Sequence, residues 1–389
     1  MLWQLTGWPW VGEAMDANAG YAVKAEAGSA RNLLHAVNSA GETATTAWLI
    51  YLALAAYFTV ALAGVTHKDL LLNTPLTLPI LGISVALDRF FLFAPPFFIL
   101  IHIGMMMQYA ILMRKAHAFL GLVRQEENEM PGGDASPVHP LRYELDGNFL
   151  VQFLAGPSYA SIFAVMLQMI VWVTLVMLAA IVLLHFQLAF LPYHDVALTW
   201  AHRLYVLADL LLVGLVGTFL TSPLPRFWAS FRYAWRNYTF FMLLTTPFFA
   251  AFIAFSFFVA TVPGETLDRT LAAIGPSAEV PAPSGEGADV RRVFLPTAYL
   301  FEGDVHPATG KSTSPFPRNL IVMDEDLVSD QGLAPADVSL SLRYRDLRYA
   351  RLDRSDLKQA DLTCADLTGA SLAGTVLTAA KRGCEAPAR

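Results

Sequence analysis

Five long apolar stretches constrain the fold of this chain more than any other feature. A helix needs about 20 mostly apolar residues to cross the hydrocarbon core of a bilayer. Each stretch approaches or exceeds that length, and only one contains a charged residue, Asp209. The sequence therefore predicts a mainly α-helical membrane protein with about five transmembrane helices. The predicted spans are Thr46–Val65, Phe91–Met113, Ser161–Leu184, Leu204–Thr221 and Tyr238–Val262.

Two shorter segments belong near the membrane without crossing it. Pro75–Leu87 is apolar but too short to span, and Pro75 and Pro79 disfavour a regular helix there. Two interpretations are open for this segment: an interfacial or re-entrant piece, or a loop lying over the bundle. Arg226–Arg236 interleaves Arg with Phe, Trp and Tyr, a pattern typical of an interfacial helix.

Basic residues are distributed unevenly between the short loops on the two sides of the predicted helix bundle. Nine lie in the N-terminal segment and in the loops after the second and fourth spans, against three in the other loops. Short loops rich in Lys and Arg stay in the cytoplasm, so the C-terminal region is predicted to be periplasmic. The nine are Lys24, Arg31, Arg114, Lys115, Arg124, Arg142, Arg226, Arg232 and Arg236, and the three are Lys68, Arg89 and Arg203.

Composition changes sharply after Val262. Residues 263–289 are rich in Pro, Gly, Ala and Glu, which predicts a linker or mobile loop. Residues 291–328 alternate short apolar runs with turn residues, which predicts a small, partly β segment. The predicted domains are an N-terminal cytoplasmic or interfacial segment (1–45), a transmembrane helical bundle (46–262), a linker with a partly β capping segment (263–337), a β-solenoid (338–380) and a tail (381–389).

A period of five residues runs through the C-terminal region. Neither a helix nor a strand produces this period, so it predicts a solenoid whose interior is filled in the same way on every side. A small residue lies two positions before most of the later leucines, whereas Leu340 and Arg345 take that place in the first units. The leucines expected to form the solenoid core are Leu342, Leu347, Leu352, Leu357, Leu362, Leu367, Leu372 and Leu377.

The units ADLTC, ADLTG and ASLAG at residues 360–374 resemble the A-D/N-L-x-x units of the pentapeptide-repeat family. The resemblance implies a square, right-handed β-helix with four units per coil, and hence about two coils here. Some members of the family mimic DNA with a strongly acidic surface, which these nearly neutral repeats lack. The chain also shows no basic patch of the kind that binds nucleic acid, so we expect no nucleic-acid partner.

The membrane part carries a second resemblance. Thr66–Ile80 and Phe190–Leu210 are similar to segments of bacterial inner-membrane proteins that carry pentapeptide repeats. This resemblance implies a multi-pass protein of the bacterial inner membrane. It implies no particular activity, because no biochemical activity is established for that group.

The two cysteines, Cys364 and Cys384, are twenty residues apart, which is one coil in the geometry that the family resemblance implies. Neighbouring rungs of a β-solenoid lie about 4.8 Å apart, within the Cα separation that a disulfide tolerates. A disulfide across the last coil is therefore one hypothesis. Two unpaired thiols are the alternative, because the repeat pattern fades after Leu377.

Polar residues of two predicted extracytoplasmic loops form a weak candidate metal site. Imidazoles and carboxylates suit divalent transition metals, but no spacing such as HxH or HxxxH supports a shared site. A structural hydrogen-bond network is the alternative for the same residues. The candidates are His67, Asp69, His194, Asp195 and His202.

His102 and Asp209 are the ionisable residues inside predicted spans. An unpaired charge in a span is costly, so such residues are functional candidates. A proton or ion pathway through the two is one interpretation. In the other, Asp209 is a structural group, near enough to the surface to be solvated or to pair with His202 or Arg203, since it lies five residues into its span.

No nucleophile elbow, phosphate-binding loop, paired carboxylates or HExxH motif occurs in the sequence. The chain is therefore predicted not to be an enzyme and to need no cofactor. The favoured function is a membrane-anchored scaffold that presents its short solenoid to a protein partner or to an identical chain. The alternative is a small transporter, channel or accessory subunit that uses His102 and Asp209. The bilayer is a predicted partner in both cases.

Overall fold

The computed structural model describes most of the chain. Several predicted features lie outside the described residues: residues 1–29 with Lys24, residues 79–81 with Pro79, Tyr238, residues 285–289 of the linker, residues 307–311 and 329–337 of the capping segment, and residues 385–389 of the tail. The described residues are 30–78, 82–129, 139–156, 161–222, 224, 226–237, 239–284, 290–306, 312–328 and 338–384.

The predicted fold class is confirmed: the described residues are mostly helical, with five helices long and apolar enough to cross a membrane and repeats at the C-terminal end. The candidate spans are generally longer than the apolar runs, because polar residues at their ends continue the helix. The largest change at a start lies in the first span, which begins at Ala30 rather than Thr46, and the fourth span begins at Val196 rather than Leu204. The candidate spans are Ala30–Ala63, Leu87–Gln125, Val165–Tyr193, Val196–Leu220 and Met242–Val259.

The helices account for most of the described residues, and two of the spans contain π-helical turns. The α-helices are α2 (Ala30–Ala63), α3 (His67–Leu72), α4 (Leu87–Glu129), α5 (Phe149–Ala155), α6 (Ser161–Trp172), α7 (Leu178–Phe190), α8 (Val196–Thr221), α9 (Phe227–Asn237), α10 (Thr239–Ala254), α11 (Thr266–Ile274) and α12 (Leu295–Phe301). The π-helical turns are η2 (Val173–Met177) and η4 (Phe255–Val259), and the 3₁₀ turns are η1 (Pro140–Arg142) and η3 (Leu191–Tyr193).

The chain forms two compact units, and several helices contribute a segment to each. Unit 1 holds the N-terminal part of α2, most of α4, all of α5, α6 and α9, and parts of α8 and α10. Unit 2 holds the remaining helical segments together with α3, α11, α12, all the strands and the repeats. Unit 1 is Met1–Tyr57, Phe97–Ile181 and Ala208–Phe249, and unit 2 is Phe58–Pro96, Val182–Leu207 and Ala250–Arg389.

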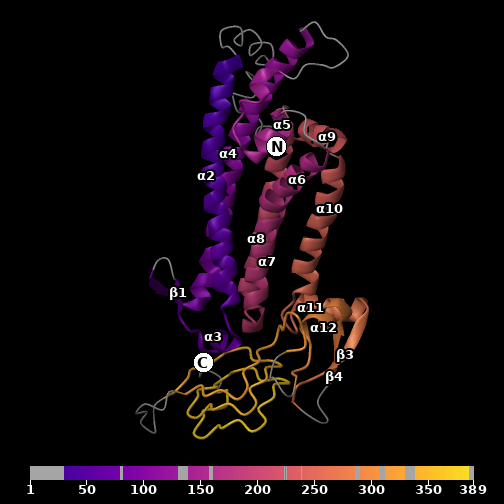
Figure 1. The fold of residues 1–389 in the computed structure, drawn as a ribbon. Coiled ribbons are helices and arrows are strands. Elements are labelled where there is room, and N and C mark those ends of the chain that lie inside the picture. Colours follow the sequence, from indigo (N-terminus) through magenta and orange to yellow (C-terminus); the bar gives the residue numbers. More distant parts are fainter. Residues whose placement is uncertain are drawn as a thin grey trace, which may run out of the picture. The chain divides into compact units, whose positions relative to one another are not determined.

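Unit 1 is held together by aromatic contacts and by one polar capping group. In Figure 1, α2 and α4 lie side by side, and the Tyr51 ring of α2 stacks on Phe98 of α4 at 5.5 Å. Asn148 caps α5 by accepting from two backbone N–H groups. The same side chain donates to Thr45 of α2 at 3.0 Å, so the cap also joins α5 to α2.

Unit 2 has an aromatic core between its helical segments. Phe58 of α2 contacts Phe90 of α4 and Phe186 of α7 at centroid distances of 6.1 and 5.3 Å. Phe91 contacts Phe190 at 4.8 Å in the same cluster. Because these rings come from three helices, their burial orders those helices relative to one another within unit 2.

The described residues of Pro75–Leu87 include two short paired strands, where the sequence suggested an interfacial or re-entrant piece or a loop. β1 (Leu76–Leu78) pairs antiparallel with β2 (Ile83–Val85). The reason is the alternation of apolar and hydroxyl residues in Leu-Thr-Leu and Ile-Ser-Val, which suits the two-residue period of a strand.

The linker prediction was wrong for Thr266–Ile274, which is helix α11. The average composition of residues 263–289 hid a short amphipathic pattern that buries Asp268 and Ala272. After α11, β3 (Ser277–Pro281) and β4 (Val290–Phe294) form an antiparallel hairpin, as the predicted partly β character suggests for part of this region. Helix α12 follows β4 directly and buries Thr297 and Phe301.

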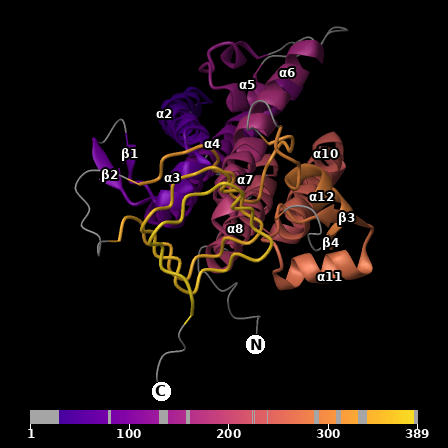
Figure 2. The same cartoon turned by 90° about the horizontal axis from the view of Figure 1, so that it is seen from below.

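The repeats wind into stacked coils, which Figures 1 and 2 show in yellow. Parallel bridges join residues twenty positions apart, from Ser341 with Asp361 to Asp361 with Lys381. Each corner is a tight turn closed by a backbone hydrogen bond, such as Ala350 N–H to Leu347 O at 3.1 Å. The third residue of each turn has positive φ, the type II geometry. The non-glycine residues with this conformation are Tyr344, Tyr349, Arg354, Gln359, Cys364 and Ala379, with φ between 56° and 59°.

The coil stack begins before the first recognisable repeat. Ile321 and Asp326 bridge Arg351 and Asp356 in parallel, so residues 320–328 already form rungs of the stack. Val322 and Leu327, five residues apart, are buried at the positions that Leu352 and Leu357 occupy in the next coil. Leu320 and Glu325 stand two positions before them, where most of the repeats have a small residue, so these rungs depart from the repeat pattern.

Candidate functional site

The intramembrane candidates His102 and Asp209 are brought together in unit 1. His102 of α4 and Asp209 of α8 are both 0% exposed, and Nδ1 of His102 lies 2.6 Å from Oδ1 of Asp209. The other ring nitrogen lies 3.3 Å from the carbonyl oxygen of Leu175, in π turn η2. The ring of Tyr51 stacks on His102 at 5.1 Å.

The chemistry of these contacts limits the protonation states of the pair. The Leu175 carbonyl can only accept, so Nε2 of His102 carries a proton. A single further proton then lies between Nδ1 and the carboxylate of Asp209. The pair is either imidazolium with carboxylate or imidazole with carboxylic acid, and it is neutral overall in both forms. A neutral pair avoids the cost of an isolated charge in hydrocarbon.

Two polar atoms beside this pair have no partner within the described part of the chain. They are Oδ2 of Asp209 and the hydroxyl of Tyr51. Buried polar atoms without partners are rare and call for an explanation. A water molecule between helices would satisfy such atoms.

The expectation that Asp209 lies near the membrane surface was wrong. Because α8 begins at Val196, Asp209 is about 20 Å from that end of the helix at 1.5 Å per residue. Neither suggested partner pairs with it. Arg203 binds Glu265, and His202 donates from Nε2 to the carbonyl of Phe91 at 2.9 Å.

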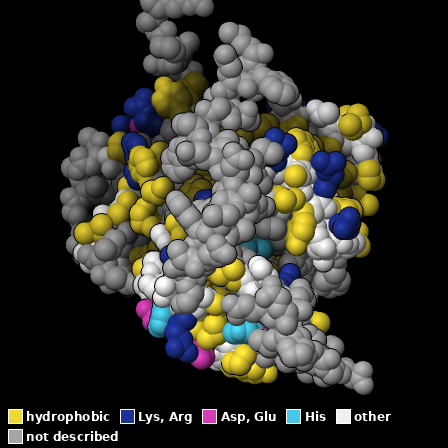
Figure 3. Space-filling view, turned by 90° about the horizontal axis from the view of Figure 1, so that it is seen from above, with side chains coloured by type: hydrophobic (Ala, Val, Ile, Leu, Met, Phe, Trp, Pro, Cys, Tyr) yellow, Lys and Arg dark blue, Asp and Glu magenta, His cyan; other side chains and the backbone are white. Residues whose placement is uncertain are grey.

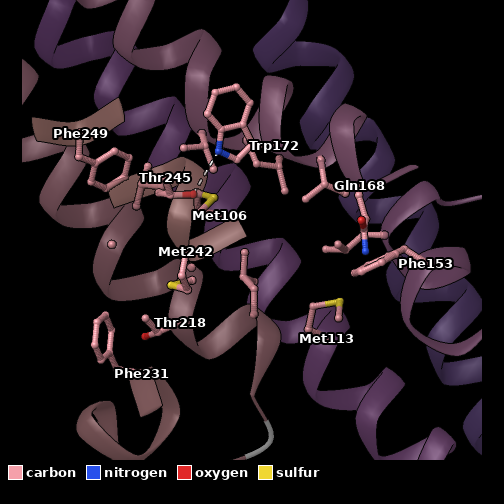
Figure 4. A pocket seen from close by; sticks show the side chains of 18 of the residues that line it. Met106, Met113, Phe153, Gln168, Trp172, Thr218, Phe231, Met242, Thr245 and Phe249 are labelled. Atoms are coloured by element: carbon pink, nitrogen blue, oxygen red, sulfur yellow. Dashed lines mark hydrogen bonds between the residues drawn. The ribbon is translucent and has the colours of Figure 1, made fainter. Parts of the chain in front are cut away.

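An apolar cavity of about 250 Å³ lies one helical turn from the pair, also in unit 1. Met106, four residues after His102, and Val213, four residues after Asp209, both line it. Figure 4 shows Trp172 at one end of the cavity, where its Nε1 donates to Thr245 at 3.1 Å. The lining is almost wholly hydrophobic, with Gln168 and threonines as its polar members.

The five metal candidates lie in unit 2, and each makes a hydrogen bond that has a structural role. His67 accepts from the backbone N–H of Ile321 at 2.9 Å, and His194 bonds to the carbonyl of Arg318 at 2.9 Å. Asp69 completes the capping box of α3, and Asp195 accepts from a backbone N–H in the first turn of α8.

Within the described ranges, no three His, Cys, Asp or Glu side chains converge to hold a metal ion. The contacts of the five candidates match the hydrogen-bond network that was the alternative. Burial, assisted by the charge of His194, lowers the pKa of His67 to about 4. The ring therefore stays neutral at physiological pH, as its role as a hydrogen-bond acceptor requires.

The second candidate site is the contact between the repeats and the membrane helices of unit 2. Arg345 stacks over the ring of Tyr193 at 3.8 Å and donates to the carbonyl of Leu70 at 3.4 Å. Lys68 of α3 forms an ion pair with Glu325 at 2.7 Å. These contacts connect the loop ends of α3 and α7 to the first rungs of the coil stack.

Asp346 completes this contact. Its carboxylate lies 3.6 Å from Nδ1 of His194 and 2.5 Å from Arg348. Burial alone would raise the pKa of Asp346, but His194 and Arg348 hold that pKa well below its usual range. The carboxylate is therefore ionised at physiological pH, and Arg348 is its charged partner.

A buried ion network joins the capping segment to the end of the last span. Arg318 is 0% exposed and donates to Glu302 at 2.5 Å, to Asp268 at 2.9 Å and to the carbonyl of Thr261 at 2.9 Å. Arg203 of α8 binds Glu265 through two hydrogen bonds. Sequence reasoning missed both networks, because Glu265 and Asp268 lie in the predicted linker and Glu302 lies in the segment predicted to be partly β.

The coil stack has one closed end and one open end within the described residues. Five of its core leucines are at most 3% exposed, whereas Leu367, Leu372 and Leu377 are only half-buried. We call residues 365–384 the terminal coil. In a longer stack, one more rung would cover these leucines and pair the outer backbone groups of the terminal coil. The five buried leucines are Leu342, Leu347, Leu352, Leu357 and Leu362.

The terminal coil is joined to the coil before it by a covalent bond. The Sγ atoms of Cys364 and Cys384 form a disulfide, with their Cα atoms 4.6 Å apart. Both residues lie on the outside of the stack, at equivalent positions one coil apart. The arrangement matches the first of the two hypotheses for these cysteines, and it suits an oxidising compartment.

Comparison with known proteins identifies pentapeptide repeats, in eight copies, at residues 346–378. No curated protein and no solved structure matches the chain. The family match covers the repeats alone, so the similarity of Thr66–Ile80 and Phe190–Leu210 to inner-membrane proteins stays a prediction.

Proposed function

We propose that this protein, whose C-terminal repeats belong to the pentapeptide-repeat family, is a membrane-anchored scaffold that presents its terminal coil to another protein. The open coil end supports this proposal best. Within residues 338–384 it combines half-buried leucines with a strand edge that no further rung pairs, and a partner can bind such an edge by adding a strand. The function needs no catalysis and no cofactor.

The attachment of the repeats to unit 2 also supports a scaffold. A flexible tether would need no such contacts. Yet Arg345 and Asp346 contact the loop after α7, and Lys68 of α3 forms an ion pair with the coil stack. Such contacts hold the repeats in a set orientation on the helices of unit 2. The scaffold would therefore display its partner at a fixed distance from the bilayer.

Photo-crosslinking in intact cells tests the proposal. A photoreactive amino acid is placed at Thr378 on the terminal coil or at Lys358, which occupies the same position one coil earlier. Both side chains are exposed. We expect a discrete adduct from position 378 and little from 358, and mass spectrometry of the adduct separates a foreign partner from a second copy. Equal yields from the two positions, or none from either, would refute the proposal.

We place the protein in the bacterial inner membrane with its repeats in the periplasm. The five candidate spans and the uneven distribution of basic residues support this orientation, as does the disulfide. Alkaline phosphatase fused after residue 389 should be active, whereas green fluorescent protein at the same position should be dark. The reverse pattern would place the repeats in the cytoplasm.

A second candidate function, proton or ion movement across the membrane, is favoured by one observation. The His102–Asp209 pair shares a single proton between two helices and lies beside two unpartnered polar atoms. A pair with a purely structural role would also be neutral, but it would not need two buried polar atoms without partners beside it. The site would then act as a step in a proton path, in a transporter or in an accessory subunit of one.

Proteoliposomes test this candidate directly. The purified chain is reconstituted around a pH-sensitive dye, and a pH gradient is imposed. Proton flux should exceed that of empty liposomes and should be lost in Asp209→Asn, which keeps the shape of the side chain. Thr218→Val, which alters another buried polar side chain of α8, is the control. Flux no greater than in empty liposomes excludes this candidate without affecting the scaffold proposal.

A further inference from the structure

The cavity in unit 1 is long and narrow. Its lining runs from Met106 to Met113 on α4 and from Met242 to Phe249 on α10, which is about 10 Å along each helix at 1.5 Å per residue. Its volume of about 250 Å³ is below the range of roughly 300–1,000 Å³ that is usual for pockets of drug-sized ligands. An apolar space of this form suits a single hydrocarbon chain.

One end of the cavity reaches helix α9. Phe231 of α9 lines it, and Figure 4 shows Phe231 beside Thr218 and Met242, at the opposite end from Trp172. The two ends therefore differ in their surroundings. The Trp172 end lies among the spans, and the Phe231 end lies against an amphipathic helix.

Helix α9 carries positive charge and interfacial aromatic residues. Arg232 and Arg236 are exposed, Trp228 is 71% exposed and Trp235 is 40% exposed. The helix contains no acidic residue. Figure 3 shows basic side chains among hydrophobic ones on the face that it draws. Exposed Trp favours the headgroup level of a bilayer, and Arg is well suited to binding phosphate there.

We infer that the cavity is a binding site for one acyl chain of an anionic phospholipid, whose phosphate lies at the arginines of α9. The lining excludes a polar ligand, because it offers few hydrogen-bond partners. The charge of α9 favours an anionic headgroup over a zwitterionic one. The inference does not depend on the proposed function, since it requires only that the helices of unit 1 lie in a bilayer.

Cavity-filling substitutions test the inference. Gly217 of α8 lines the cavity, and a Cβ atom added there meets no atom within 4 Å. Leu at this position would therefore extend into the space of the acyl chain. Gly104 of α4 is exposed, does not line the cavity and is equally open around its Cβ position, so Gly104→Leu is the matched control.

Native mass spectrometry of the full chain, delipidated and then supplied with phosphatidylglycerol or phosphatidylcholine, measures the bound lipid. We expect one tightly held phosphatidylglycerol, at least tenfold weaker binding in Gly217→Leu and unchanged binding in Gly104→Leu. Replacing Arg232 and Arg236 by Gln should weaken phosphatidylglycerol binding about fivefold for each residue. Wild-type binding by Gly217→Leu would overturn the inference, and equal affinity for the two lipids would overturn its anionic part.

A second measurement keeps the inference testable if Gly217→Leu does not fold. Phosphatidylglycerol brominated in its acyl chains quenches nearby Trp fluorescence. Trp172 lines the cavity, so part of the quenching should saturate at one lipid per protein and be lost in Trp172→Phe. Trp48, which does not line the cavity, serves as the control for Trp→Phe. If Trp172→Phe leaves the saturable quenching intact, no acyl chain occupies the cavity.

Discussion

Removal of the Glu265 carboxylate should be among the most destabilising single changes in unit 2. Glu265 holds Arg203 through two hydrogen bonds, at 2.5 and 3.2 Å, and it also accepts from the backbone N–H of Val262 at 3.2 Å. The side chains of Arg203 and Glu265 are 0% and 2% exposed. The variant Glu265→Ala therefore leaves a guanidinium in the interior without a counter-charge.

The magnitude follows from these contacts. A hydrogen bond to a charged group contributes about 1.5–3 kcal/mol, and the two from Arg203 are lost. Breaking a buried ion pair by removing one partner costs about 3–5 kcal/mol, which agrees with that sum. Arg203 keeps its bonds to the carbonyls of Ser256 and Ala260. We therefore expect a loss of about 3–5 kcal/mol in the free energy of unfolding.

Equilibrium unfolding of the purified chain in detergent micelles, titrated with SDS, measures this loss. Arg354→Ala is the matched control, because Arg354 and Asp324 form the same two-pronged pair with both side chains more than half exposed. Exposed pairs contribute little, so the control should unfold like the wild type. If Glu265→Ala is no less stable than Arg354→Ala, the Arg203–Glu265 pair does not have the structural role that its burial indicates.

Three further outcomes are expected. Cys384→Ser opens the loop closed by Cys364 and should cost the terminal coil about 3 kcal/mol, while a count of two free thiols in non-reduced protein would contradict the disulfide. Burial and His194 lower the pKa of His67 to about 4. The contribution of the neutral His67 ring to stability should therefore be full above pH ~6.5 and fall as the pH drops towards 4. His67→Gln should flatten this profile, measured as the unfolding midpoint at pH 7.5 and 5. Gly369→Ala should cost about 1–2 kcal/mol, since φ is +68° and the new Cβ would lie 2.6 Å from an aromatic ring; an unchanged melting temperature would contradict this.

The existence of the spans was predictable because it depends on local composition. A run of apolar residues favours the bilayer whatever the rest of the chain does, so the five candidate spans follow from the sequence. The period of the repeats was predictable for a similar reason. Each five-residue unit forms the same turn and buries the same leucine position, so the pattern is written into every unit.

The start of α8 was not predictable in this way. Asp195, His202 and Arg203 raise the apparent cost of a span locally, so the apolar run begins at Leu204. In the folded chain Arg203 is neutralised by Glu265, which lies 62 residues further on. A local scale cannot include that partner, and the helix therefore extends to Val196.

The sequence by itself determined that the chain has five helices apolar enough to cross a membrane and a solenoid of pentapeptide repeats, because hydropathy and period are properties of neighbouring residues. Only the tertiary structure decided how the charged groups are paired. His102 and Asp209 are 107 residues apart, and they meet because α4 and α8 lie side by side. The free energy of an intramembrane charge depends on the partner that folding brings to it, so the candidate sites of this protein are properties of the fold.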